Sequence, residues 1–248
     1  MSHEDYKERA ARFAAEAERR QSKHEYTRIT PTDCMAEVWR CKQPETSNYA
    51  FDIVVTRYGI ASFGDIGGLT FNVGASYGIK FLAGNDVEYY IHQKLDQDCK
   101  RTELDEDYFT EKCIELVLER LQEDDLCELT PPAQESMPID TFKTVLSDWL
   151  WDKYQAHDDN HDLLYDLHEF IGDANASSAQ EAYDHLSDNS KLFGGIDYWE
   201  YGFERPAQCL IQHLYMLRHA AIQILKVKHP AAGSAIGSYG SMGEEVES

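Results

Sequence analysis

The spacing of apolar residues predicts several amphipathic helices. Apolar side chains recur three and four positions apart in Asp105–Glu123, and Ile139–Tyr154 repeats that pattern. Further helices are expected over residues 2–23, 85–95, 162–171, 178–186 and 205–228. The last of these is the most apolar, which predicts a central place in the packing of the C-terminal part.

A different pattern occupies residues 34–73, where short apolar stretches are separated by turn residues. The run AFDIVVTR (50–57) is rich in β-branched residues, and Tyr58-Gly59 follows it as a turn signal. The run GDIGG (64–68) predicts a second tight turn before the next short strand. Short strands joined by short turns indicate an antiparallel meander. The predicted fold class is therefore α+β: an N-terminal helix, a small antiparallel β-meander and a mostly helical C-terminal part.

The same patterns suggest four segments. Residues 1–30 form a helical arm with a thin apolar face, which is expected to pack on another subunit and to make a homo-oligomer. Residues 31–128 hold the antiparallel sheet and acidic helices, and residues 129–229 form a helical part. Residues 230–248 are rich in Gly, Ser and Ala, which predicts a disordered tail.

Charge changes this picture most. The chain of 248 residues has a formal net charge of -22, yet residues 86–204 carry -23 and the rest +1. Such an acidic chain is not expected to bind nucleic acid directly or to dock on an anionic membrane. A field concentrated over one region can attract a partner with a basic surface. The alternative is a set of solvated helix faces that keep the protein soluble.

If a partner is bound, acidic and aromatic side chains within or beside that block are its expected contacts. They are Asp105, Glu106, Asp107, Glu123, Asp124, Asp125, Asp158, Asp159, Trp199, Glu200 and Tyr201. The aromatic stretch 198–204 allows three interpretations: an interaction hot spot, a base-stacking surface that the charge disfavours, or a structural anchor. In the anchor interpretation, Trp199, Tyr201 and Phe203 fix the last helix against the sheet.

One segment has the residue types of a metal site. His157 and His161 are four residues apart, with carboxylates between them, and His168 follows seven residues later. Imidazole and carboxylate ligands suit zinc, manganese or iron. Together with Asp65 of the GDIGG run, this group would support a metal-dependent hydrolase or nuclease. The alternatives are a polar loop between helices for the histidines and a hairpin turn for Asp65.

Other chemistry is not indicated. None of the six cysteines forms a C-x-x-C pair, and Cys113 and Cys209 are expected to be small buried hydrophobes. No Ser-His-Asp or Cys-His arrangement is legible, so we expect no catalytic residue and no cofactor. The start MSHEDYKERAARF lacks the apolar run of a secretory signal, and no stretch approaches a membrane span. The expected location is the cytoplasm.

Two segments together resemble a known family. The hairpin TRYGIASFGDIGGLTF (56–71) and the helix DYWEYGFERPAQCLIQHLYMLRHAAIQI (197–224) are similar to phage and prophage accessory proteins with a GDIG hairpin and an aromatic-rich final helix. The likeness spans about residues 48–226. Gly64, Asp65, Gly67 and Phe71 match, whereas Arg57-Tyr58-Gly59 replaces the family's Trp-Pro-Gly.

The resemblance implies a phage inhibitor that binds and blocks a bacterial defence complex in the host cytoplasm, such as a CRISPR effector or a defence nuclease, in the manner of the Gabija anti-defence proteins. The acidic helices would then mimic nucleic acid on the partner's basic surface. A structural or assembly protein is the third alternative beside this inhibitor and the metal-dependent hydrolase.

Overall fold

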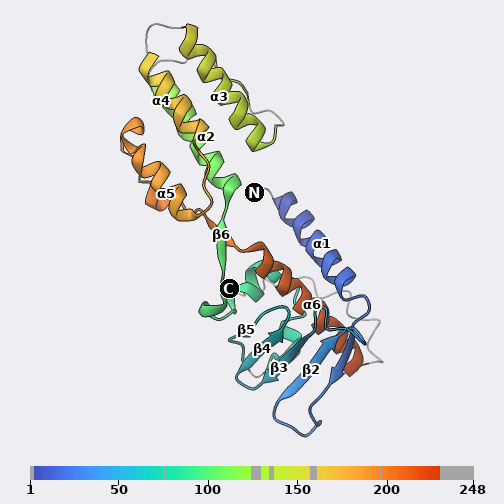
Figure 1. Ribbon diagram of the computed structural model, residues 1–248. Coiled ribbons are helices and arrows are strands. Elements are labelled where there is room, and N and C mark those ends of the chain that lie inside the picture. The colour runs from blue at the N-terminus through green and yellow to red at the C-terminus, as the bar shows by residue number, and fades with distance from the viewer. Residues whose placement is uncertain are drawn as a thin grey trace, which may run out of the picture. The chain divides into compact units, whose positions relative to one another are not determined.

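The computed structural model describes residues 3–74, 76–123, 130–133, 137–156, 161–195 and 197–229. It confirms the α+β class, with an N-terminal helix, a five-stranded antiparallel sheet and a mostly helical C-terminal part (Figure 1). The chain divides into two compact units. We call Met1–Arg101 with Ala207–Ser248 the sheet unit, and Thr102–Pro206 the helical unit.

This division differs from the expected boundaries at residues 30, 128 and 229. The helical unit is an insertion within the sheet unit, because the chain leaves the sheet unit after Arg101 and returns to it at Ala207. The insertion begins and ends in a two-stranded ribbon, in which Thr102 pairs with Pro206. A pairing between residues so far apart in the sequence leaves no local signal.

The sheet unit begins with α1 (His3–Arg20) and contains the antiparallel sheet in the order β1-β2-β3-β4-β5. The strands are β1 (Glu25–Arg28), β2 (Glu37–Lys42), β3 (Phe51–Thr56), β4 (Gly59–Gly64) and β5 (Leu69–Phe71). Three short helical segments follow: η1 (Gly78–Phe81), the π-helix η2 (Val87–Ile91) and η3 (Gln97–Cys99). The last element described in this unit is α6 (Gln208–Lys228), and the predicted disordered tail at 230–248 lies outside the described residues.

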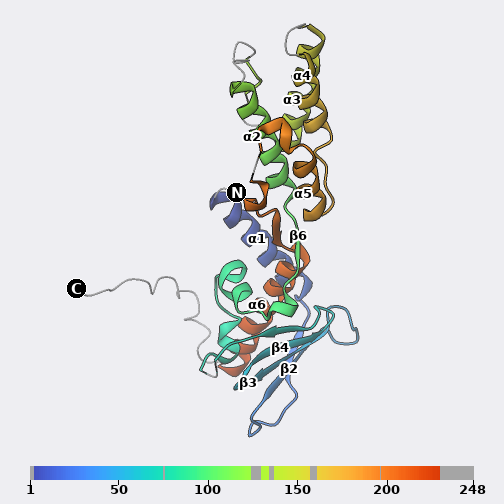
Figure 2. The ribbon, with the colours of Figure 1, turned by 90° about the vertical axis from the view of Figure 1, so that its left-hand side faces the viewer.

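One face of the sheet packs against α6, and α1 lies beside α6 (Figures 1 and 2). Alternate residues of β3, Phe51, Ile53 and Val55, are buried there, as the period of two in a strand requires. The α6 residues Leu214, Leu217 and Ala221 belong to the same core. The last helix therefore has a central place, but in the core that it shares with α1 and the sheet. The prediction that it is central to the packing of the C-terminal helices is wrong, because α3, α4 and α5 belong to the core of the other unit.

The N-terminal helix does not extend away from this core as an arm. Phe13 and Ala17 are buried, and the Phe13 ring stacks on Tyr215 of α6 with the centroids 5.7 Å apart. The side chain of Gln21, just after α1, donates to the carbonyl of Met216 at 2.9 Å. The thin apolar face of α1 is thus used within its own chain, and oligomerisation through α1 stays a prediction.

The GDIGG run forms the expected hairpin turn between β4 and β5. Asp65 has a structural role there: its backbone N–H donates to the carbonyl of Ala50 at 2.9 Å, and its carboxylate accepts from the N–H of Ala50 at 3.2 Å. The turn is therefore fastened to the start of β3.

The helical unit has its own hydrophobic core. Its elements are β6 (Thr102–Leu104), α2 (Glu106–Glu123), α3 (Ile139–Ala156), α4 (His161–Gly172), α5 (Ala179–Asp188), η5 (Ser190–Phe193), η6 (Tyr198–Glu200) and β7 (Glu204–Pro206). The predicted helices at 105–123, 139–154, 162–171 and 178–186 are confirmed to within two residues at each end. The predicted start of the last helix at Arg205 is wrong, because Arg205 and Pro206 belong to β7.

Phe203 is the centre of an aromatic cluster in this core. It is fully buried, and its ring lies 5.4 Å from that of Phe109 and 5.2 Å from that of Tyr183. The interpretation of the aromatic stretch as an anchor against the sheet is therefore wrong for Phe203, which packs on α2 and α5. Burial of Cys113 is confirmed, whereas the predicted burial of Cys209 is wrong: Cys209 lies in the first turn of α6, where it and Gln208 are exposed.

The surroundings of His185 predict that the stability of the helical unit depends on pH. Its ring is stacked on Phe170 at 4.8 Å and meets Phe109 edge-on at 5.8 Å, and burial lowers the pKa of this imidazole. In the unfolded chain this imidazole takes up a proton near pH 6.5, whereas in the folded state it does so only at a lower pH. The contribution of His185 to the free energy of unfolding is therefore fully present above pH 6.5 and is lost as the pH falls below that value.

We expect His185→Phe, which keeps the ring packing and cannot titrate, to reduce this dependence. The free energy of unfolding of the wild type should fall between pH 7.5 and 5.5 more steeply than that of the variant, by at most about 1.4 kcal/mol per pH unit. Urea denaturation at several pH values measures the difference, in which the contributions of all other titrating groups cancel. Parallel pH profiles would contradict the assignment.

Candidate protein-binding surface

The helical unit carries almost the entire charge of the chain. Its 105 residues contain 27 acidic and 6 basic side chains, a net charge of -21, and the sheet unit accounts for the remaining -1. The charge block predicted from the sequence therefore coincides closely with one folded unit. A compact body of this charge attracts cations over about a Debye length, ~8 Å at physiological salt.

Most of this charge faces solvent. Of the 21 acidic residues that the structure describes in the helical unit, 18 are exposed and three are partly buried. Several of the six basic side chains are engaged locally. Arg205 pairs with Glu103 at 3.1 Å and with Asp105 at 3.2 Å, and Lys112 pairs with Glu115. Local pairing thus leaves a large excess of carboxylates for an external partner.

The predicted acidic contact residues of α2 and the loops fall into three groups: those paired within the chain, those exposed without an ion pair among the described residues, and those outside the described residues. Asp105 is structural, because Arg205 binds its carboxylate and its carbonyl accepts from the N–H of Phe109 in the first turn of α2. Glu123 pairs with Arg120 at 3.5 Å. Glu106 and Asp107 are exposed, and within the described part of the chain no ion pair involves them. Asp124, Asp125, Asp158 and Asp159 lie outside the described residues.

Trp199 stands out in the aromatic stretch. It is 71% exposed, although it is stacked on Tyr183 at 6.0 Å and contacts Tyr198 at 4.5 Å. The rings of Trp199, Tyr183 and Tyr198 thus form a small aromatic platform. The hydroxyl of Tyr183 donates to the carbonyl of Tyr201 at 2.6 Å, which stabilises this platform. Tyr201 is half-buried and supports the platform, while Glu200 is exposed beside Trp199. A rigid exposed tryptophan with a neighbouring carboxylate has the properties of an interface hot spot.

A second group of exposed aromatics escaped the sequence analysis. Trp151 of α3 is 41% exposed and Tyr165 of α4 is 39% exposed, both in the helical unit. The signal was present in the helical spacing, because Trp151 follows the apolar stripe that ends at Trp149 and Leu150 and so falls outside it. A tryptophan outside the apolar stripe of a helix is a candidate contact residue.

The predicted metal ligands are not assembled as a site. The Nδ1 atom of His168 lies 3.0 Å from the carbonyl of Ser147, and the ring of His161 packs on Tyr154 at 3.9 Å. Asp65 is bound to Ala50 in the other unit. His157 lies outside the described residues, and among those described no group of three or more His, Cys, Asp or Glu is arranged to hold a metal ion.

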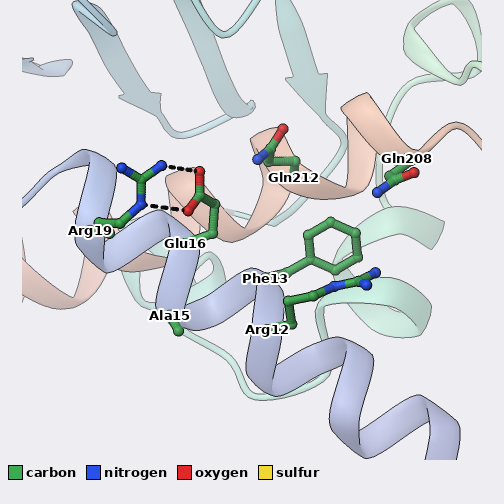
Figure 3. A pocket seen from close by; sticks show the side chains of 7 residues that line it. All are labelled: Arg12, Phe13, Ala15, Glu16, Arg19, Gln208 and Gln212. Carbon is green, nitrogen blue, oxygen red and sulfur yellow. Dashed lines mark hydrogen bonds and ion pairs between the residues drawn. The ribbon is translucent and has the colours of Figure 1, made fainter.

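The sheet unit has an open groove of about 460 Å³ between α1 and α6 (Figure 3). Its lining residues are Arg12, Phe13, Ala15, Glu16, Arg19, Gln208 and Gln212. Arg19 binds the Glu16 carboxylate through two nitrogens, at 2.7 and 2.6 Å, and these bonds lower the pKa of that carboxyl to about 2. The charged groups of the groove thus largely satisfy one another.

No family model matches this chain, and neither a curated protein nor a solved structure matches it. The resemblance to phage accessory proteins therefore stays a prediction. Among the described residues, no helix is both long and apolar enough to cross a membrane.

Proposed function

We propose that this protein acts by binding, and that its helical unit occupies the basic, nucleic-acid-binding surface of a partner protein. The observation that carries the proposal is the concentration of a net charge of -21 in one folded unit of 105 residues. Exposed carboxylates on a rigid scaffold present a field similar to that of phosphates, which steers a basic partner and competes with its nucleic acid.

The partner class that the resemblance suggests is a bacterial defence complex, which the protein would block by keeping DNA or RNA from its channel. The exposed Trp199 adds an aromatic contact of the kind that dominates protein interfaces. The metal-dependent hydrolase has no comparable support, since Asp65 and His168 are engaged in hydrogen bonds within their own units.

Removing three exposed charges from the helical unit should weaken this binding. We expect Glu106→Gln, Asp107→Asn and Glu200→Gln together to lower the affinity for the defence complex about tenfold at physiological salt, at roughly 0.5 kcal/mol for each exposed charge. The difference in affinity between the wild type and the triple variant should shrink as the salt concentration is raised. Pull-down from the bacterial host identifies the complex, and competition with duplex DNA for the purified complex gives the affinity.

The matched control removes the same charge from the sheet unit. Glu8→Gln, Glu25→Gln and Asp33→Asn alter three exposed acidic residues there and should change the affinity less than about twofold. Equal losses of affinity in both triple variants would mean that binding depends on the total charge of the protein and not on the charge of the helical unit. Binding that ignores salt and both sets of substitutions would refute the mimicry of nucleic acid.

A further inference from the structure

The outer side of the α3–α4 helix pair carries a continuous row of aromatic rings. The ring of Trp151 lies 5.1 Å from that of Tyr154 and 5.1 Å from that of His168, and Tyr165 lies 5.4 Å from Tyr154. Trp151 and Tyr165 are both more than one-third exposed. We call Trp151, Tyr154, Tyr165 and His168 the aromatic face.

The aromatic face is held in place by its own helices. The Nδ1 atom of His168 lies within hydrogen-bond distance of both the hydroxyl of Ser147, at 3.2 Å, and the carbonyl of Ser147, at 3.0 Å. This fixes the imidazole beside Trp151, so the indole packs against two neighbouring rings that restrict it. A partner that binds a preorganised ring loses less conformational entropy than one that must order it.

Carboxylates flank the rings on the same helices. Asp148 precedes Trp151 by three residues, Asp162 precedes Tyr165 by three, and Glu169 follows Tyr165 by four, so helical geometry places each beside its ring. All three carboxylates are exposed. Lys153, the basic residue of α3 nearest in sequence, lies over the ring of Trp149 at 5.8 Å.

The negative charge of the helical unit determines which kind of partner can bind the aromatic face. A second copy that docked through its own helical unit would bring another net charge of -21 against the first, and nucleic acid would also be repelled. The C-terminal residues 230–248 hold three acidic residues and no basic ones, so the chain's own end is equally unsuited. A cationic segment is attracted, and arginine fits rings and carboxylates together, because its planar guanidinium stacks on aromatics while donating to carboxylates.

We propose that the aromatic face binds an arginine-rich segment of the basic partner, with a guanidinium stacked on Trp151 and paired with the adjacent carboxylates. This inference rests on the proposed function, since it names the chemical group that the acidic unit recognises. It also adds selectivity, because a smooth negative field attracts lysine and arginine alike, whereas a stacking surface prefers arginine.

The test uses the full-length chain and two probes, an oligo-arginine and an oligo-lysine peptide of equal length, titrated at physiological salt by calorimetry. We expect the wild type to bind oligo-arginine about fivefold more tightly than oligo-lysine. Trp151→Ala should reduce this ratio to about one by weakening oligo-arginine alone. Trp151→Phe should keep most of the preference, because a ring remains.

The matched control is Tyr58→Ala, which removes an aromatic that is 76% exposed in the sheet unit and should leave the ratio unchanged. Circular dichroism and melting temperature check that each variant folds. A preference that survives Trp151→Ala overturns the inference, and so does one that Trp199→Ala removes instead. A wild type without any preference for arginine overturns it as well.

These outcomes are separate from those that test the proposed function. If Trp151→Ala keeps the arginine preference while the Glu106, Asp107 and Glu200 triple variant still loses affinity for the defence complex, only the arginine site is refuted. If the triple variant binds the complex as tightly as the wild type does, the proposed function is refuted, because the helical unit is then not the binding element. This conclusion does not depend on the result of the peptide titrations.

Discussion

Gly64→Ala is expected to unfold much of the sheet unit, with a loss of at least about 3 kcal/mol in its free energy of unfolding. Gly64 has φ +123°, a conformation that residues with a side chain rarely adopt, and it pairs with Phe51 at the end of β4. A Cβ atom there would lie 2.4 Å from the carbonyl oxygen of Ala50 and 2.8 Å from the Cα of Phe51. Both neighbours are backbone atoms, which cannot move aside without breaking the β3–β4 pairing.

Two other glycines of the same run serve as matched controls. Gly67 has φ +80°, and a Cβ atom added there would meet nothing within 4 Å, so Gly67→Ala should cost about 1–2 kcal/mol from backbone strain alone. Gly68 has neither a positive φ nor a close neighbour, and Gly68→Ala should be nearly neutral. Chemical denaturation together with hydrogen exchange of peptides covering residues 51–71 distinguishes the three variants.

The order Gly64, then Gly67, then Gly68 is the expected result. A Gly64→Ala protein as stable as Gly68→Ala would show that β4 does not approach Ala50 so closely. The expected order also bears on function, because it assigns the GDIGG run to the close approach of two strands. Its first glycine faces the chain's own backbone, and its aspartate is bound to that same backbone.

The sequence predicted those parts of the fold that local patterns determine. Ile139–Ala156 was found almost to the residue, because its apolar stripe repeats over four turns. The strand β1 (Glu25–Arg28) was missed, since four residues with the sequence EYTR lack a strand pattern and depend on pairing with β2. Arg205 was placed in a helix, although a residue before proline favours extended backbone and so indicated β7.

The candidate surface was predictable in its charge and not in its geometry. Counting charges located the acidic block at residues 86–204, close to the helical unit at 102–206. The role of Asp105 was not visible, because its partner Arg205 is brought near by the pairing of β6 with β7, a hundred residues apart in the chain. The packing of Tyr154 and His168 around Trp151 likewise depends on how α3 and α4 meet.

The same limit explains why the sequence could not decide between an interaction hot spot and a structural anchor for the aromatic stretch. Trp199 and Phe203 are both large aromatic residues only four positions apart, yet Trp199 is exposed and Phe203 is fully buried. Tertiary packing on α2 and α5 makes that difference. Substituting each in turn therefore separates what stabilises the helical unit from what the unit presents to a partner.

Phe203→Ala is expected to destabilise the helical unit by about 3–5 kcal/mol. The substitution would leave a cavity between the rings of Tyr108, Phe109, Tyr183 and Tyr201, which all contact Phe203. It would also weaken the hydrogen bond in which the N–H of Asp105 donates to the carbonyl of Phe203 at 2.8 Å. Urea denaturation followed by circular dichroism gives the free energy of unfolding, and hydrogen exchange locates the loss in the helical unit.

Trp199→Ala is the matched control, because it removes a larger aromatic side chain from the same cluster. As Trp199 is mostly exposed, this variant should lose less than about 1 kcal/mol of stability. If Phe203→Ala costs no more than Trp199→Ala, the helical unit does not depend on this core. If the two variants differ in stability as expected, a loss of partner affinity in Trp199→Ala is assigned to a missing contact. The same loss in Phe203→Ala is assigned to unfolding of the helical unit.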